Sequence, residues 1–462
     1  MDQSISDRLK SYLAQLPPQA QALLLREFEK AHAAGKDLPV TTLVLDQLHQ
    51  IIRIDDSTGR ARSVERPERI VFRPLEPFLV DGDQLPGPGE IRRTSLDSIW
   101  LWLTRDVLPD ASKVCLEALD AAENLSAAAA LPEAVIRFRA EVVVAIAEQL
   151  RGGRVRISSP QAAEDLPRVA VALQAAEALQ VLGKRLPGHI RVLDETQVAA
   201  VFEALNLPSL QGPAVIPFAL SVVMGRLGAP WQMIRLPISL VRSDDEIRVA
   251  ASPYGVAVTM ALRDLGDSIG LLQMDLRHGR YNRVLDHLKA LNDGVRGIRT
   301  ELDLRQDSQW GRHLVQLRKA ISEILQSEIG SAPGRVRRLL RQRPDKEITP
   351  GLKLDSLEVD EAVGHVAFVA SCRAYAAELA INEVTGRTFS EMQQYVERTL
   401  EALLETLRVS DGAVLSFRQA QAVAAIRLCE PLFGADYSAL MARAVESAAS
   451  AERKTKAKAK AG

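Results

Sequence analysis

Apolar residues recur at helical spacing along most of the chain, and the clearest repeat lies in the C-terminal half. There, three consecutive segments carry apolar residues alternately three and four positions apart, with interruptions near Gly279 and near Asp307–Ser308. A seam of this kind is buried against another helix at a shallow angle. The pattern therefore predicts three helices in an antiparallel bundle, which explains it at least as well as one long rod. The seam positions are Leu262, Leu265, Ile269, Leu272 and Leu276; Tyr281, Val284, Leu288, Leu291, Val295, Ile298 and Leu302; and Trp310, Leu314, Leu317, Ile321 and Ile324.

Two glycines, Gly294 and Gly297, lie inside the second segment. Each costs about 1 kcal/mol relative to alanine in a helix interior. They therefore indicate either a close approach between helices or a flexible point.

The N-terminal half is interrupted by a proline-rich stretch, residues 55–93. Its five prolines and four glycines forbid a continuous helix. It is nevertheless rich in apolar residues, and long structureless connections are uncommon in compact domains. We expect it to pack either across the chain's own helices, which we favour, or on a partner. We also expect Trp102, which lies off the apolar face of the next helix, to meet it. The candidate docking residues are Phe72, Leu75, Phe78 and Leu79.

These patterns predict an all-α, multi-helix protein with a coiled-coil-like bundle in its C-terminal half and a long proline-rich, non-helical segment near its N-terminus. Abundant alanine and leucine, with only 4% aromatic residues, favour helices over strands. Within the junction, Glu246–Ala250 could form a small hairpin. The expected divisions are a small helical unit (1–54), the proline-rich segment (55–93), a helical domain (94–206), an irregular junction (207–256), the C-terminal bundle (257–450) and a disordered basic tail (451–462).

Composition indicates a folded, soluble, cytoplasmic chain. Hydrophobic residues make up 47% and charged residues 25%, and the net charge of −1 predicts no general affinity for nucleic acid or membranes. No apolar run approaches the roughly 20 residues that span a bilayer, and no signal peptide is visible. The three cysteines are far apart and form no CxxC pair, so we expect reduced, buried thiols.

Motifs that carry chemistry are not found. The sequence contains no phosphate-binding GxxxxGK[ST] loop, GxGxxG, GxSxG or HExxH, and its seven histidines form no close pair. We therefore assign no catalytic, cofactor-binding or metal-binding residue and expect no cofactor.

Local charge gives one further candidate site. Residues 275–343 carry fifteen basic and eight acidic side chains, and the basic ones are densest in a helix expected over 333–343, with Pro333 near its start. This helix could contact phosphates or an acidic partner. Alternatively, its arginines pair with the six acids of residues 345–361, which we favour. The candidate contact residues are Arg335, Arg337, Arg338, Arg341 and Arg343.

Three functional hypotheses remain, in order of preference. The first is a non-enzymatic scaffold or adaptor that binds a protein partner or associates with itself. The second is a nucleic-acid-associated regulator that uses the basic helix. The third is an enzyme or small-ligand binder with a pocket between the two helical halves, near residues 207–256.

Overall fold

The computed structural model describes residues 66–82, 85–122, 131–153 and 155–461. The small helical unit expected over residues 1–54 lies outside these ranges. The described part is all-α, and apart from isolated bridges its only strands are the two-residue pair β1 (Leu79–Val80) and β2 (Ile91–Arg92), which run parallel. Among the described residues, 71–82, 85–122, 131–153 and 155–461 belong to one compact unit, and residues 66–70 belong to another.

The proline-rich segment contains short helical pieces where the sequence predicts none. Helix α4 (Pro67–Phe72) is followed by a 3₁₀ helix, η1 (Arg73–Phe78), and then by β1. Pro67 occupies the first position of α4, where its missing N–H is not needed. Pro74 and Pro77 cannot donate backbone hydrogen bonds, so the chain continues as a tight 3₁₀ turn and not as a long helix.

The next part of the chain is a series of helices interrupted by short connections. They are α5 (Arg93–Trp102), the π-helical turn η2 (Leu103–Val107), α6 (Pro109–Asp120), α7 (Glu133–Arg151), α8 (Pro160–Gln174), α9 (Ala176–Arg185) and α10 (Glu195–Leu205).

The junction consists of short helices. They are η3 (Pro208–Leu210), α11 (Ile216–Met224), η4 (Pro230–Ile234), α12 (Arg235–Val241) and α13 (Glu246–Ala250). The hairpin expected at α13 is therefore wrong. The carboxylate of Asp245 accepts a hydrogen bond from the backbone N–H of Arg248 at 2.9 Å, which caps a helix start and overrides the β-branched composition.

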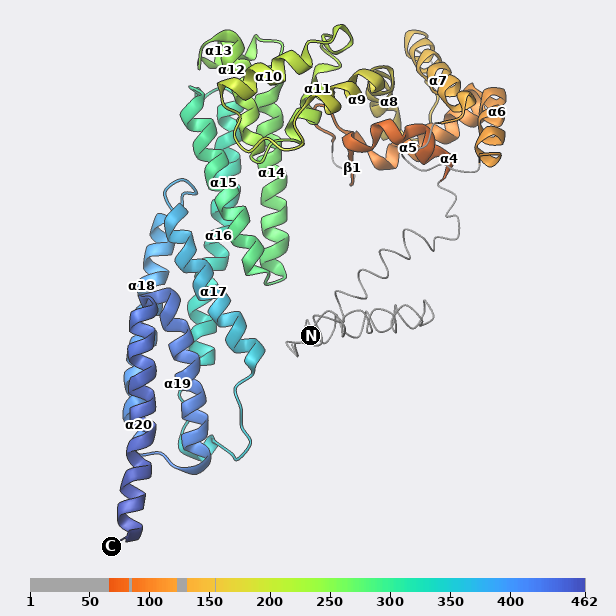
Figure 1. Ribbon diagram of the computed structural model, residues 1–462. Coiled ribbons are helices and arrows are strands. Elements are labelled where there is room, and N and C mark those ends of the chain that lie inside the picture. Colours follow the sequence, from red (N-terminus) through yellow and green to blue (C-terminus); the bar gives the residue numbers. More distant parts are fainter. Residues whose placement is uncertain (1–65, 83–84, 123–130, 154, 462) are drawn as a thin grey trace, which may run out of the picture. The chain divides into compact units, whose positions relative to one another are not determined.

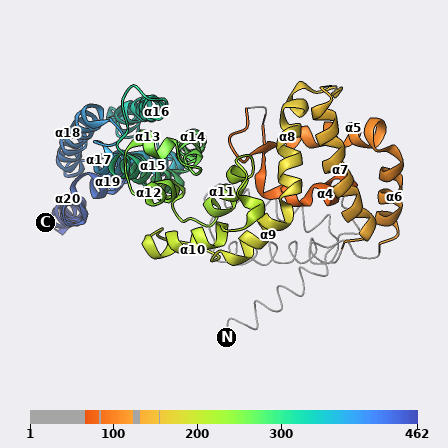
Figure 2. The same cartoon turned by 90° about the horizontal axis from the view of Figure 1, so that it is seen from above.

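The C-terminal half is a bundle of long helices (Figure 1). Figure 2 looks roughly along the axes of α16–α19, which lie beside one another. The bounds are α14 (Val256–Arg277), α15 (Tyr281–Glu301), α16 (Gln309–Leu339), the short η5 (Asp345–Glu347), α17 (Ser356–Tyr375), α18 (Asn382–Leu407), α19 (Gly412–Phe433) and α20 (Ala435–Ala461).

The heptad seams of α14, α15 and α16 are buried together in one hydrophobic core. The two glycines inside α15 permit close packing there. A Cβ atom on Gly294 would lie 2.5 Å from Cδ2 of Leu265, and one on Gly297 would lie 2.4 Å from the ring of Trp231. Close approach therefore accounts for both glycines.

Helix α16 continues through Pro333, where the sequence suggests the start of a separate helix over 333–343, and it ends at Leu339, so Arg341 and Arg343 lie beyond it. Pro333 leaves the carbonyl of Ile329 without its intrahelical donor, which normally breaks a helix. Here Ile329, Ala332 and Val336 are buried in the core around it. Burial of this face keeps the helix continuous despite the lost hydrogen bond.

Helix α20 runs to Ala461, through the stretch predicted as a disordered basic tail. Alanine and lysine alternate there, and both have high helix propensity. In the described ranges, no helix combines the length and the apolar character needed to cross a membrane.

Candidate functional site

The apolar side chains of the proline-rich segment are buried within the chain. Leu75 is completely buried, and Phe72 and Phe78 are 2% and 3% exposed, while Leu79 is half-buried. The ring of Trp100 meets Phe72 edge-on, at 6.1 Å between centroids, and Trp102, expected to contact this segment, is itself buried. In this conformation Phe72, Leu75 and Phe78 offer almost no surface to a partner.

A buried carboxylate fastens the end of this segment to α8. Asp165 is completely buried and accepts a hydrogen bond from the hydroxyl of Ser95 at 2.7 Å. It also accepts the backbone N–H of Arg92 at 3.3 Å and lies 3.5 Å from the guanidinium of Arg92. Arg168, one turn further along α8, donates to the carbonyl of Pro86 at 3.2 Å. The segment is thus held by polar contacts as well as by its apolar side chains.

The five arginines of the candidate anion site do not form a free cationic surface. Three of them make ion pairs with acids from α16, α17 and α18, and a fourth, Arg343, lies over the ring of Phe417. The guanidinium of Arg341 has no ion-pair partner among the described residues. The ion pairs join Arg335 to Glu361 and Glu328, Arg337 to Glu391, and Arg338 to Glu358.

A buried polar cluster links α15, α16 and α17. Nε2 of His365 lies 3.1 Å from the carboxylate of Glu328, and its ring stacks on Tyr281 at 5.4 Å. The hydrogen bond to His365 lowers the pKa of Glu328 despite the opposing effect of burial. Nδ1 of His365 is buried with no partner in the described part of the chain. The contacts of this cluster join three helices of the bundle to one another.

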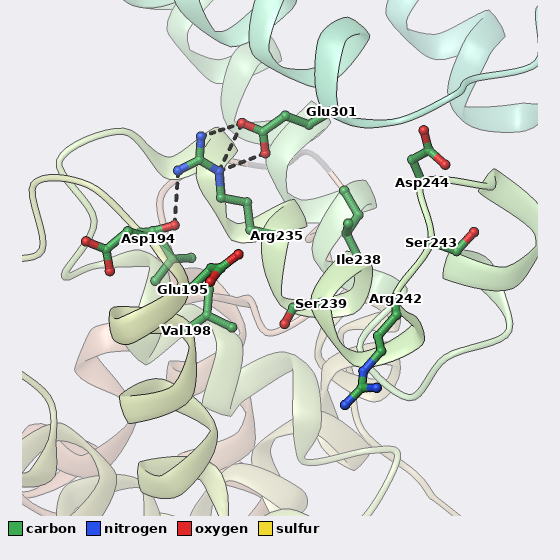
Figure 3. A pocket seen from close by; sticks show the side chains of 11 residues that line it. Asp194, Glu195, Val198, Arg235, Ile238, Ser239, Arg242, Ser243, Asp244 and Glu301 are labelled. Atoms are coloured by element: carbon green, nitrogen blue, oxygen red, sulfur yellow. Dashed lines mark hydrogen bonds and ion pairs between the residues drawn. The ribbon is translucent and has the colours of Figure 1, made fainter.

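The junction and its neighbours line a pocket of about 760 Å³ that is open to solvent (Figure 3). Arg235, the first residue of α12, donates to the carboxylate of Glu301 at 2.7 Å and 3.0 Å and to the carbonyl of Leu193 at 3.0 Å. The hydrogen bond to Glu301 raises the pKa of Arg235, so the guanidinium stays charged at any accessible pH. Arg235 also lies 5.4 Å over the ring of Trp231.

The other polar groups of this pocket carry both signs of charge. Asp194 and Glu195 begin α10 on one side, and Arg242 lies on the other (Figure 3). Arg242 has a φ of 51°, in the left-handed region that residues with a Cβ adopt at a cost of about 1 kcal/mol. Its guanidinium has no ion-pair partner in the part of the chain that the structure describes. Asp244 also lines the pocket, near Arg242, so an arginine without an ion pair among the described residues lies opposite Asp194 and Glu195 and beside a third acid.

A second candidate surface is one face of α14, formed by Asp264, Asp267, Gly270, Leu271 and Met274. These residues are mostly three or four positions apart, so they lie in one strip along the helix. Leu271 and Met274 are 48% and 43% exposed, and nothing lies within 4 Å of a Cβ added to Gly270. We call this strip the α14 face. Its opposite side is the buried seam, so α14 is apolar on two sides.

Comparison with protein-family models, curated proteins and solved structures finds no match. Within the described ranges, no group of three or more histidine, cysteine, aspartate or glutamate side chains is placed to hold a metal ion. The candidate sites therefore rest on their geometry alone.

Neither the Arg235 pocket nor the α14 face is visible as a sequence motif. Arg235 and Glu301 are 66 residues apart, and only the fold brings them together. The sequence contains a weak indication of the α14 face, because Leu271 and Met274 are apolar residues that lie off the seam of an otherwise regular heptad pattern.

Proposed function

We propose that the chain is a non-enzymatic helical scaffold that acts through contacts with a protein partner, and that the α14 face is one contact surface. The observation that carries this proposal is the exposure of Leu271 and Met274, one turn apart on a long helix whose other side is already buried. Isolated exposed apolar residues are normal on protein surfaces. Here the two apolar side chains lie one turn apart, in one strip with two acids that have no ion pair among the described residues, so a partner could contact both kinds of group at once.

A partner protein accounts for this surface better than self-association through the heptad seams does. The seam residues are packed in a core within the chain, so their apolar side chains are not available to a second copy. We place the protein in the cytoplasm. Its cysteines, which are buried and unpaired, suit a reducing compartment: Cys115, Cys372 and Cys429.

Site-specific photo-crosslinking in the cells of origin tests the scaffold proposal. A photoreactive residue at position 271 should give discrete crosslinked products that disappear when Met274→Lys is added. The matched control is the same probe at Ile136, which is 56% exposed on α7. If the two positions give equal crosslinking, or if Met274→Lys changes nothing, the α14 face is not a contact surface.

A second candidate function is small-ligand binding in the Arg235 pocket. Its volume of about 760 Å³ lies within the range of known ligand sites, and its polar groups converge from α10, α12 and α15. An NMR fragment screen of the full chain tests it. Bound fragments should lose affinity in Arg242→Ala but keep it in Arg248→Ala, an exposed arginine outside the pocket. Equal binding to both variants argues against the pocket.

Nucleic-acid binding through the basic helix has less support, because three of its five guanidinium groups are paired with carboxylates. This hypothesis requires an affinity for DNA or RNA that falls steeply as the salt concentration rises. Binding to DNA or RNA that is unchanged after Arg341→Ala and Arg343→Ala excludes these two arginines, which follow the end of α16, as nucleic-acid contacts.

A further inference from the structure

The α14 face runs at its N-terminal end into a cleft of about 430 Å³. The cleft lies where η1 and β1 of the proline-rich segment, α11, η4 and α14 meet. Its walls are polar and apolar in about equal measure, and the charged groups come from α14 and from Glu90. The apolar walls include Pro77, Phe78, Val80, Met224, Pro230 and Met260.

The charges in the cleft leave an excess of negative charge. Arg263 donates to the two carboxylate oxygens of Glu90 at 2.9 Å and 3.2 Å, so this pair is internally neutralised. The side chain of Arg263 also lies close to the backbone of Gly87, because a Cβ added to Gly87 would be 2.4 Å from its Cδ. The carboxylates of Asp264 and Asp267 have no hydrogen bond or ion pair with any residue that the structure describes. Two carboxylates therefore remain without a partner.

Asp264 is the more enclosed of these two carboxylates. Burial, together with the nearby charge of Asp267, raises the pKa of Asp264 to about 6. Burial also raises the pKa of Asp267, and Glu90 adds to this while Arg263 opposes it. A half-buried carboxylate with no partner destabilises the fold in which it sits. Such uncompensated groups are found preferentially at functional sites.

The spacing along α14 defines what could cover this surface. Leu271 and Met274 follow Asp264 by seven and ten residues, which is about 10 Å and 15 Å at a rise of about 1.5 Å per residue. A complementary segment must therefore carry a cation and apolar side chains about two to three helical turns apart.

We propose that this cleft receives the ammonium or guanidinium group of a lysine or arginine on a partner segment, whose apolar side chains cover Leu271 and Met274. This inference rests on the proposed scaffold function and specifies the chemistry of its partner. The cation would offset the charges of Asp264 and Asp267, and its alkyl stem would contact the apolar walls, as long basic side chains do elsewhere. Opposite charges would also set the register of the segment.

A display library of random helical peptides tests this chemistry. The library is selected on the full chain and counter-selected on Asp264→Asn, which preserves shape and removes charge. Enriched peptides should carry lysine or arginine about seven to ten residues from a large apolar residue. They should bind Asp264→Asn at least about tenfold more weakly than the wild type. Asp286→Asn, a change of an exposed acid on α15, should leave the affinity within about twofold.

The dependence on pH gives a second readout. Affinity should fall as the pH is lowered through about 6, because Asp264 becomes protonated, and Asp264→Asn should lose most of this dependence. Thermal unfolding of the variant checks that it is folded. No enrichment of basic residues, or equal binding to Asp264→Asn, overturns the inference. If peptides bind through Leu271 and Met274 but ignore Asp264, the scaffold proposal survives and this one fails.

Discussion

The charge of Asp264 should cost the protein stability at neutral pH, and Asp264→Asn should therefore stabilise it. The pKa of this carboxyl is about 6 in the folded chain, against an ordinary value of 3.8. At about 1.36 kcal/mol for each tenfold change in proton affinity, this difference corresponds to about 3 kcal/mol. Because the cleft is partly open to solvent, screening reduces the penalty to about 1–2 kcal/mol.

The sign of the pH dependence follows from the raised pKa. Above about pH 6 the carboxyl is charged in both the folded and the unfolded chain, so the full penalty applies. Between about pH 6 and 3.8 the folded chain binds the proton and the unfolded chain does not, so the penalty disappears as the pH falls. Asparagine resembles the protonated acid in shape and charge. The stabilisation should therefore be largest near neutral pH, at about 7.5, and nearly absent at about pH 4.

Thermal and urea unfolding at matched pH values measure the difference in stability between the wild type and Asp264→Asn, with Asp286→Asn as the control. Because a chain of this length need not unfold in one step, the relevant quantity is the shift of the transition that includes α14. A variant that is less stable than the wild type near neutral pH would refute the reasoning. So would a stabilisation of the same size at acidic and neutral pH.

Three further predictions concern other parts of the fold. Asp165→Ala should destabilise the chain by about 3 kcal/mol in urea unfolding, because the buried Arg92 loses its buried counter-charge, whereas Asp165→Asn should cost less. Gly297→Ala should lower stability by about 1–3 kcal/mol and change the fluorescence of Trp231, since the new methyl overlaps its ring. The three cysteines should react with a thiol reagent in the native protein much more slowly than in urea; burial raises the pKa of Cys115 and Cys429 to about 11.

The sequence was sufficient to predict the bundle because periodicity reports directly on burial. An alternating spacing of three and four residues leaves one helical face that must be covered, and residues such as Leu272, Leu291 and Ile321 are indeed completely buried. Prediction was weaker where local rules and tertiary packing disagree. Pro333 signals a helix boundary locally, but its neighbours in the core hold α16 together across it.

The candidate surfaces were harder to predict, because they depend on distances that the sequence does not contain. Asp264 is one acid among 59 acidic residues, and only the fold shows that it shares a cleft with Pro77 and Phe78, far away in the sequence, without a cation paired to it in the described ranges. Whether a cation lies beside Asp264 depends on every segment that surrounds it in the fold. A local sequence pattern therefore cannot predict that none does.

The proline-rich segment shows both an effect of local sequence and an effect of the fold. Its prolines prevent a long helix, which leaves Phe78 and Val80 to form one wall of the acidic cleft. A wall built from irregular backbone needs anchors, and the segment has at least two of them. Asp165 holds its end at Arg92, and the ion pair of Glu90 with Arg263 ties it directly to α14. The segment expected to pack through its apolar side chains buries them within the chain, and in doing so it shapes a surface on which a partner could bind.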